Sequence, residues 1–441
     1  MINMRKNLLF IVSIISLFFP VFSFSNIIFQ PIDSTGYVYN PIDWKDINKL
    51  IVKEENQNTI IDIIDYESDT ISLDLNKYTV FNGATVPLVM ITTDLPMDEI
   101  PDKVNYQTAN ISISGFGDYK DFEGEVQIRG RGNTSWIMFP KKPYRLKFEK
   151  KQELCGLKKA KSFVLTANWT DVSLMQNPIA SFLGKMLDLP FTHTMIPVDV
   201  IFNGTYRGSY LLTNKPGINS GSVDIDEDTS VMWELDNSYD EDMKFKSPVY
   251  NLPVMLSDPD MDEERFEYWK QDFIEMERAV SEGNIEDWID LEIYAKYRII
   301  YDIMYNKEIG HPKSVKIYKT EGEKYKFGPL WDFDVALGYQ FDTDESYTNR
   351  ELYWSLWVND LMVAIEKDEN CRLLMKEYFQ KFLDNEDELW EFIDEYFETI
   401  KSSALRNNIR WKERGDWENN VGKMKQWLKK RIVFLKSVYR N

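Results

Sequence analysis

The spacing of apolar residues changes along the chain, and this change limits the possible folds more than any other feature. In residues 141–150 apolar and charged side chains alternate, so that Tyr144, Leu146 and Phe148 share one face, as in a half-buried strand. In residues 263–280 apolar residues recur every three or four positions, as in an amphipathic helix. The order predicts an α+β chain with a β-rich N-terminal half and a helical C-terminal half.

Turn residues and caps divide the two halves into expected elements. The clearest is 198–214, two strands joined by Asn203-Gly204, because Asn-Gly readily adopts the positive backbone angles of a type I′ turn. Other strands are expected at 124–130, 162–168 and 230–237, and a hairpin at 314–334. Helices are expected at 171–189, where Asp171 is a plausible cap, at 263–280 and 290–306, and over most of 351–441.

The first 25 residues have the form of a secretory signal peptide. Arg5 and Lys6 precede an apolar run over 8–22, which is shorter than the ~20 residues that span a bilayer, so cleavage is favoured over a membrane anchor. We therefore expect a secreted or extracytoplasmic protein, at the cell surface or in the periplasm. We expect no stable membrane insertion after the signal is cleaved.

Charge and composition exclude several kinds of partner and site. The net charge of −20 argues against binding nucleic acid or an anionic membrane surface. Cys155 and Cys371 allow either one disulfide or two buried free thiols. With only these two cysteines and two histidines, His193 and His311, a Cys-based zinc site and a His-rich metal centre are excluded. Chemistry must therefore depend on carboxylates, lysines or the backbone.

The stretch "GPLWDFDVALG" (328–338) places two acids, Asp332 and Asp334, on either side of one Phe. Upstream, a Gly-rich turn over 130–133 precedes Lys147, which is on the polar face of its strand; a cation near a glycine turn suits phosphate. A polar loop and a hairpin then lead to the acids, which is the layout by which protein kinases place a base and a metal-binding Asp. Taken singly, each feature also fits a structural role as a tight turn, a solvated lysine or surface acids.

Long, ordered stretches of the sequence resemble the CotH kinases, a family named for a spore coat protein. The stretches are "IRGRGNTSWIMFPKKPYRLKF" (128–148), "LKKAKSFVLTANWTDVSLMQNPIASFLGKML" (157–187), "VDVIFNGTYRGSYLL" (198–212), "WELDN" (233–237), "GHPKSVKIYK" (310–319) and "GPLWDFDVALG" (328–338). The resemblance implies an atypical, reduced protein-kinase-like fold and phosphate transfer from ATP to Ser of secreted or coat proteins.

The resemblance also implies a division of the chain. A signal peptide (1–25) and a β-rich N-terminal region (26–120) would precede a CotH kinase-like domain over 121–441, of which 351–441 is a helical tail. Residues 26–120 could be a separate small β module or extra strands on the kinase-like core.

The nucleotide site that the resemblance implies lies in the Gly-rich turn and the strand after it. Lys147 looks like the strand lysine that holds the phosphates of ATP, and Lys142 is a second candidate. Arg131 and Asn133, from the turn, complete the expected ATP-binding set.

The resemblance places the metal and the base on the loop and the turn that follow. Asp332 resembles the aspartate that binds Mg²⁺ or Mn²⁺, and Asp334 is an alternative or second ligand. In the family the catalytic loop often reads Asn-x-Asp with a later Asn. Here it is 306–308, so Glu308 would accept the proton of the substrate hydroxyl, and Ser314 stands where the later metal-binding Asn would be.

Three functions remain open from the sequence. The first is an exported, ATP- and magnesium-dependent Ser/Thr protein kinase that acts on exported proteins, with Lys147, Glu308 and Asp332 as catalytic residues. The second is a catalytically weak pseudokinase or surface scaffold that binds nucleotide or a protein partner, which the departures at Glu308 and Ser314 favour. The third is another phosphotransfer, such as nucleotide transfer to a protein or a surface polymer.

Overall fold

The structure is a computed structural model that describes part of the chain. The described residues are the strands β1 (Ile28–Phe29), β2 (Ile42–Asp43), β3 (Lys49–Glu55), β4 (Asn58–Ile64) and β5 (Thr70–Asp74), and then 86–94, 100–115, 118–310, 312–337, 359–412 and 415–440. β1 pairs with β2, and β3, β4 and β5 form a three-stranded antiparallel sheet. The expected signal peptide, His311 and residues 351–358 lie outside the described residues.

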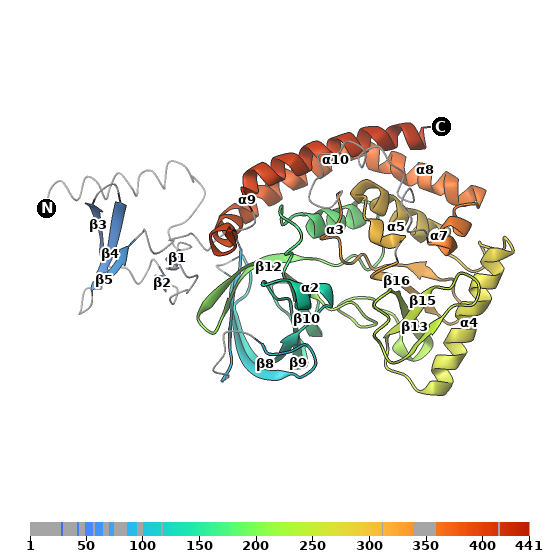
Figure 1. Ribbon diagram of the computed structural model, residues 1–441, viewed down its shortest axis with the longest axis horizontal. Coiled ribbons are helices and arrows are strands. Elements are labelled where there is room, and N and C mark those ends of the chain that lie inside the picture. Colours follow the sequence, from blue (N-terminus) through green and yellow to red (C-terminus); the bar gives the residue numbers. More distant parts are fainter. Residues whose placement is uncertain are drawn as a thin grey trace.

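Seven strands close into a barrel, which is drawn in cyan to green in Figure 1. They are β6 (Leu88–Thr92), β7 (Gln107–Ser114), β8 (Phe122–Gly130), β9 (Tyr144–Gln152), β10 (Ala160–Thr166), β11 (Ile196–Phe202) and β12 (Thr205–Asn214). Neighbours around the barrel follow the order β10-β12-β11-β6-β7-β8-β9, and every pair is antiparallel except β11 with β6. The apolar face predicted for 141–150 points into the barrel core, where Tyr144, Leu146 and Phe148 are buried.

The turn at Asn203-Gly204 is confirmed. Both residues have positive φ, 46° and 76°, and they join β11 to β12 in an antiparallel hairpin. The Asn203 side chain also accepts a hydrogen bond of 2.8 Å from the backbone N–H of Thr93, which follows β6. The hairpin turn is therefore tied to the neighbouring strand of the barrel.

A second, five-stranded antiparallel sheet follows the barrel in sequence, with the order β14-β15-β13-β16-β17. Its strands are β13 (Ser230–Leu235), β14 (Lys244–Lys246), β15 (Pro253–Asp258), β16 (Val315–Thr320) and β17 (Lys326–Phe327). The predicted strand at 230–237 and hairpin at 314–334 are thus confirmed. Helix α4 (Glu263–Ser281) packs against this sheet, because Trp233 lies between Phe266 and Phe273 of the helix.

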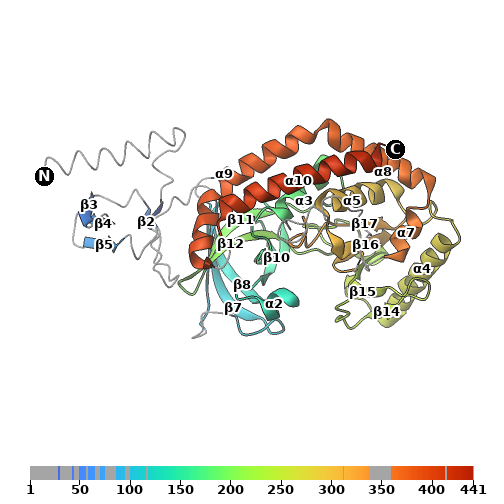
Figure 2. The ribbon, with the colours of Figure 1, turned by 45° about the horizontal axis from the view of Figure 1, so that its top comes forward.

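Helices make up the C-terminal part. α5 (Leu291–Met304) is buried along most of its length, and α7 (Asp360–Ile365), α8 (Glu369–Asp384), α9 (Glu386–Arg410) and α10 (Trp417–Tyr439) follow. Figures 1 and 2 show α9 and α10 arching over α3 (Gln176–Met186) and α5, from the barrel to α8. None of the helices in the described part of the chain is long and apolar enough to cross a membrane.

The coarse division that the sequence predicts is confirmed: a β-rich N-terminal half and a helical C-terminal half. The finer expectation of a protein-kinase-like fold needs correction, because a closed barrel of seven strands is not the arrangement of a conventional protein kinase. Closure removes every exposed strand edge from this part of the molecule. Strands β6 and β7 come from before residue 121, so the barrel uses segments from both sides of that expected boundary.

Both cysteines are buried free thiols. Cys155 lies in the core of the barrel and Cys371 in the core formed by the helices. Burial raises the pKa of each thiol to about 12, so neither is a reactive thiolate at neutral pH. The sequence left open either one disulfide or two free thiols, and the structure has two free thiols.

Candidate active site

The acidic turn at Asp332, Phe333 and Asp334 follows β17 and is anchored in the core by its aromatic residue. Phe333 is 1% exposed, and its ring centre lies 4.7 Å from that of Tyr301 on α5. Its backbone N–H donates a hydrogen bond of 2.9 Å to Oδ1 of Asn177. Asp332 has a φ of +64°, a left-handed conformation uncommon for residues other than glycine. The turn therefore buries its Phe and leaves its two acids half-buried.

Asn177 belongs to α3 (Gln176–Met186), which starts later than the expected 171–189. The five residues before the helix form a turn held by Asp171, whose carboxylate accepts hydrogen bonds from the backbone N–H groups of Ser173 and Gln176, both at 2.8 Å. The expectation that Asp171 is the cap needs correction, because the N-cap is Met175, which has no side-chain cap; Asp171 instead holds the turn before the helix. This turn places Thr170 and Asn177 beside the acidic turn.

The two carboxylates of the turn have different partners. Asp334 accepts a hydrogen bond from the hydroxyl of Thr170, and Asp332 accepts one of 3.3 Å from Oγ of Ser314. The carboxyl groups of Asp332 and Asp334 also hydrogen-bond each other. Burial, and then the negative charge of Asp332, raise the pKa of Asp334 well above its usual range. Two like charges so close favour either a shared proton or a bound cation.

The loop after α5 carries the expected base. Asn306 caps a short 3₁₀ helix, η5 (Lys307–Ile309), by accepting a hydrogen bond of 3.1 Å from the N–H of Glu308. The Asn306 amide also donates a hydrogen bond of 3.1 Å to the carbonyl oxygen of Asp332. Burial, and then the charge of Asp332, raise the pKa of Glu308 well above its usual range. Glu308 and Asp332 therefore share one site, as the sequence predicts.

Ser314 joins this loop to the second sheet. It has a φ of +54°, and its N–H donates a hydrogen bond of 3.1 Å to Oδ2 of Asp236, the residue that follows β13. Burial also raises the pKa of Asp236. Lys313 lies alongside, with its Nζ 3.9 Å from Oε1 of Glu308. The acids of the site thus come from three segments that are distant in sequence.

The donor set fits a magnesium ion. Asp332, Asp334 and Ser314 present oxygen atoms to one another, and hard oxygen ligands of this kind suit Mg²⁺. Within the described residues, no three His, Cys, Asp or Glu side chains form a complete metal cage. Mg²⁺ is usually held by one or two carboxylates together with water and substrate phosphates, so such a cage is not required.

Three partly buried cations lie near one another, because the charge of Arg145 acts on both Arg131 and Lys215. We call Arg131, Arg145 and Lys215 the crevice cations. Burial lowers the pKa of all three. The charges of Asp332 and Glu234 act on Arg131, whose guanidinium lies 5.4 Å from the ring centre of Trp331.

The crevice cations have no direct acidic partner. None of them forms an ion pair with a described residue, although the neighbouring Lys316 pairs with Glu234 at 2.9 Å. The Nε of Arg145 is buried without a hydrogen-bond partner. Desolvated cations without paired acids are well suited to an anionic ligand.

Lys147, the lysine that the sequence favours for the phosphates, is exposed on the outer face of β9. Its Nζ lies 5.8 Å from the ring centre of Tyr106. Arg145 is on the same face of this strand but is largely buried, and residues two apart on a strand are about 7 Å from each other. The structure therefore brings Arg145 closer than Lys147 to the other crevice cations.

The remaining expected ATP-binding residues differ in position. Arg131 is one of the crevice cations, and the charges of Asp332 and Asp334 act on it. The Lys142 ammonium donates a hydrogen bond of 2.6 Å to the carbonyl oxygen of Trp136. The Asn133 side chain accepts a hydrogen bond from Lys103 and donates one of 3.0 Å to Asp240, so it joins the Gly-rich turn to the loop after β13. Local contacts thus occupy Lys142 and Asn133.

The glycines of the turn have structural roles. A Cβ on Gly130 would lie 2.4 Å from the ring of Trp136, and Gly132 has a φ of +81°. The turn shape therefore requires both glycines. It carries Arg131 and leads into the short helix α2 (Thr134–Met138).

The comparison with family models decides the family. The model described as CotH kinase protein matches residues 127–435, which is most of the chain. The chain belongs to the CotH kinase family. No curated protein matches it. The matched range contains every residue of the acidic site and all three crevice cations, whereas β6 and β7 of the barrel precede it.

Sequence reasoning about this CotH kinase family member found Asp332, Asp334, Glu308, Ser314 and Arg131, which the structure brings together. It missed a second group: Thr170, Asp236, Arg145 and Lys215. Arg145 has the same strand face as Lys147 in "PYRLKF", so the alternation of side chains could have drawn attention to it. Lys215 has no local signal, because it follows β12 directly and its position is set by the pairing of β10 with β12.

Proposed function

We propose that this CotH kinase family member is an exported, ATP- and magnesium-dependent protein kinase that transfers the γ-phosphate to Ser or Thr of secreted or surface proteins. The observation that carries the proposal is the hydrogen bond from the Asn306 side chain to the carbonyl oxygen of Asp332. It joins the loop of the expected base to the turn of the expected metal ligands. The signal-like first 25 residues support export.

The crevice cations would bind the phosphates. Arg131 and Arg145 present planar guanidinium groups that can donate two parallel hydrogen bonds to phosphate oxygens, and Lys215 adds a point charge. All three are partly desolvated, which strengthens their attraction for an anion. Lys147 would lie at the solvent side of this group.

Asp332, Asp334 and Ser314 would hold Mg²⁺ or Mn²⁺. When bound, the ion would neutralise charge on the β- and γ-phosphates. Thr170 fixes Asp334 by its hydrogen bond. Asn306 and Asn177 fix the peptide between Asp332 and Phe333, by hydrogen bonds with its carbonyl oxygen and its N–H, respectively. The side chains that would hold the metal are therefore oriented before the metal or ATP binds. Such positioning is the main requirement of phosphoryl transfer.

Glu308 would act as the general base. The hydroxyl oxygen of the acceptor forms a bond to the γ-phosphorus, the bond from that phosphorus to the bridging oxygen breaks, and ADP leaves. The hydroxyl proton passes to the Glu308 carboxylate. Burial and the charge of Asp332 hold the pKa of Glu308 high in the free protein, so neutralising Asp332 favours the ionised, basic form. Lys313, 3.9 Å from Glu308, offers a further positive charge.

The test is phosphate transfer from γ-labelled ATP by residues 26–441, the form expected after export, with Mg²⁺ or Mn²⁺. A generic basic protein and an extract of exported proteins serve as acceptors, and the Asp332→Asn protein is the matched control. We expect label in the acceptor with the wild-type protein and none with the variant, both having the same circular dichroism spectrum.

Other outcomes reject the proposal in distinct ways. Equal labelling by a folded Asp332→Asn protein would remove Asp332 from the mechanism. Metal-dependent ATP binding without labelling would indicate a pseudokinase. A mass increase equal to a nucleotide rather than a phosphate would indicate nucleotide transfer.

A further inference from the structure

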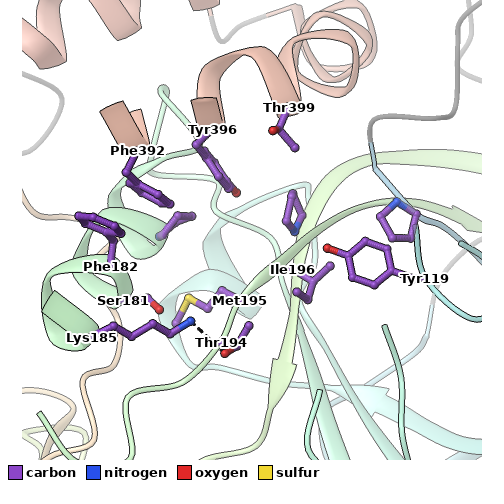
Figure 3. A pocket seen from close by; sticks show the side chains of 13 residues that line it. Tyr119, Ser181, Phe182, Lys185, Thr194, Met195, Ile196, Phe392, Tyr396 and Thr399 are labelled. Atoms are coloured by element: carbon purple, nitrogen blue, oxygen red, sulfur yellow. Dashed lines mark hydrogen bonds between the residues drawn. The ribbon is translucent and has the colours of Figure 1, made fainter. Parts of the chain in front are cut away.

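A cavity of about 240 Å³ lies between α3, β11 and α9, separate from the acidic site (Figure 3). The residues that line it are Pro87, Tyr119, Pro178, Ser181, Phe182, Lys185, Thr194, Met195, Ile196, Pro197, Phe392, Tyr396 and Thr399. On α3 the lining residues Pro178, Ser181, Phe182 and Lys185 share one face of the helix. Proteins hold small ligands in such concave, mostly apolar sites.

One wall of the cavity is aromatic. The rings of Phe182 on α3 and Phe392 on α9 stack with their centres 4.3 Å apart and an angle of 9° between their planes. Tyr396 lies next to Phe392, with ring centres 5.6 Å apart. Figure 3 shows these rings at one side of the cavity and Met195 and Ile196 on the other side. The cavity therefore offers an apolar surface to the body of a ligand.

Tyr396 brings a polar group into this apolar surface. Its side chain is 8% exposed, and its hydroxyl is buried without a hydrogen-bond partner. In Figure 3 the hydroxyl end of Tyr396 points into the cavity, away from α9. Buried hydroxyl groups nearly always have a partner, so this one is available to a hydrogen-bonding ligand or to a water molecule.

Lys185 adds a positive charge at the edge of the cavity. Its ammonium donates a hydrogen bond of 3.0 Å to Oγ1 of Thr194, which leaves two of its three donor positions for a ligand. Partial burial lowers its pKa. None of the lining residues is acidic, so no carboxylate in the wall neutralises this charge.

We propose that this cavity binds a small amphipathic carboxylate. The apolar body of the ligand packs against Phe182, Phe392 and Ile196, and its carboxylate accepts hydrogen bonds from the Tyr396 hydroxyl and the Lys185 ammonium. The ligand is small, because drug-sized ligands occupy pockets of about 300–1,000 Å³. The proposal does not depend on the proposed kinase activity. Its ligand would nonetheless contact α3, the helix that holds Phe333.

The experiment is calorimetric titration of the full chain with sodium octanoate at pH 7.5 and, separately, with octanol as the uncharged match. We expect saturable 1:1 binding of octanoate and at least tenfold weaker binding of octanol, as a charge-assisted hydrogen bond is worth about that factor or more. Tyr396→Phe removes only the hydroxyl and should weaken octanoate binding about two- to tenfold. Lys185→Gln should weaken it about two- to tenfold, because solvent partly screens the exposed charge of Lys185.

The control is Lys376→Gln, which removes the same charge from an exposed lysine on α8, away from the cavity. We expect this variant to bind octanoate like the wild-type protein. Absence of saturable octanoate binding would overturn the proposal. Two other results would also overturn it: equal affinity for octanoate and octanol, or equal octanoate affinity in Lys185→Gln and wild type. Either would show an apolar cavity that does not recognise a carboxylate.

Discussion

The backbone N–H of Phe333 donates a hydrogen bond of 2.9 Å to the side-chain oxygen of Asn177, 156 residues earlier in the chain. The amide nitrogen of Asn177 in turn donates a bond of 3.3 Å to Asn168, just after β10. One buried amide thus links the barrel, α3 and the turn that carries Asp332 and Asp334. The orientation of both acids depends on this link.

Replacing Asn177 with Ala should destabilise the protein and slow phosphate transfer. The N–H of Phe333 would remain buried without an acceptor, which costs about 1–3 kcal/mol. Urea unfolding measures the loss, and the transfer assay measures the effect on the turn. The control is Asn370→Ala, at an exposed asparagine that hydrogen-bonds Glu286, for which we expect a change within about 0.5 kcal/mol. Equal stability of the Asn177 and Asn370 variants would contradict the role of the link.

Local signals were sufficient for much of the fold. The alternation in 141–150, the Asn203-Gly204 turn and the helical spacing of 263–280 each depend on neighbours within a few residues, and the structure confirms each of them. Closure of the barrel depends instead on the parallel pairing of β6 with β11, more than 100 residues apart. No periodicity within either strand specifies such a partner.

The residues of the candidate site likewise fall into two groups, those that local sequence signals predict and those that distant strand pairing brings together. The acids of 332–334 and Glu308, the expected base, are recognisable because their motifs are short and ordered. The crevice cations are brought together by pairing between distant strands and by burial, so the sequence indicated Lys147, with Lys142 as a second candidate, and not Arg145. Lys147 and Arg145 have the same side-chain direction in sequence, and only burial in the folded protein distinguishes them.

The crevice cations predict which substitutions weaken ATP binding. Arg145→Met and Lys215→Met should each raise the Kd for ATP with Mg²⁺ by about tenfold or more, since each would remove a charged hydrogen-bond donor from a desolvated site. Lys147→Met should change the Kd by less than about twofold, because an exposed charge is screened by solvent. Calorimetric titration measures all three. If Lys147→Met had the largest effect, the original assignment of Lys147 would be restored.

Glu308 should affect the chemical step and not nucleotide binding. Glu308→Gln keeps the size of the side chain but removes the proton acceptor, so kcat should fall by about 10²–10⁴ while the Kd for ATP stays the same. Glu308→Asp restores the residue type usual in the family and should retain measurable transfer. Single-turnover kinetics with labelled ATP measures the step. An unchanged kcat for Glu308→Gln would exclude Glu308 as the base.

A buried ion pair should hold α9 to the barrel. The guanidinium of Arg406 donates to Asp199 on β11, which also accepts hydrogen bonds from Tyr206 at 2.5 Å and Ser403 at 2.8 Å. Arg406→Met would leave Asp199 buried without its counter-charge and should lower the free energy of unfolding by about 3–5 kcal/mol. Lys401→Met breaks a solvent-exposed pair with Glu418 and should cost at most about 1 kcal/mol. Similar losses in the two variants would show that burial of the Arg406 pair has no special effect.

His193 should make the protein less stable as the pH falls below 6.5. The imidazole is buried, with Nε2 2.6 Å from the hydroxyl of Ser222 and its ring centre 5.6 Å from that of Trp331. Burial, and then the positive charges of Lys316 and Lys158, lower the pKa of His193 from 6.5 to about 3. Between these two pH values the unfolded chain binds a proton that the folded protein does not.

The free energy of unfolding should therefore decrease by about 1.4 kcal/mol per pH unit from this residue, or about 2 kcal/mol between pH 6.5 and pH 5.0. Urea unfolding of the wild-type protein and of His193→Asn at several pH values isolates the contribution, because all other titrating groups are common to both proteins. The stability of the wild type relative to the variant should fall by about that amount over the interval. A difference that stays constant with pH would mean that His193 is protonated as readily in the folded protein as in the unfolded chain.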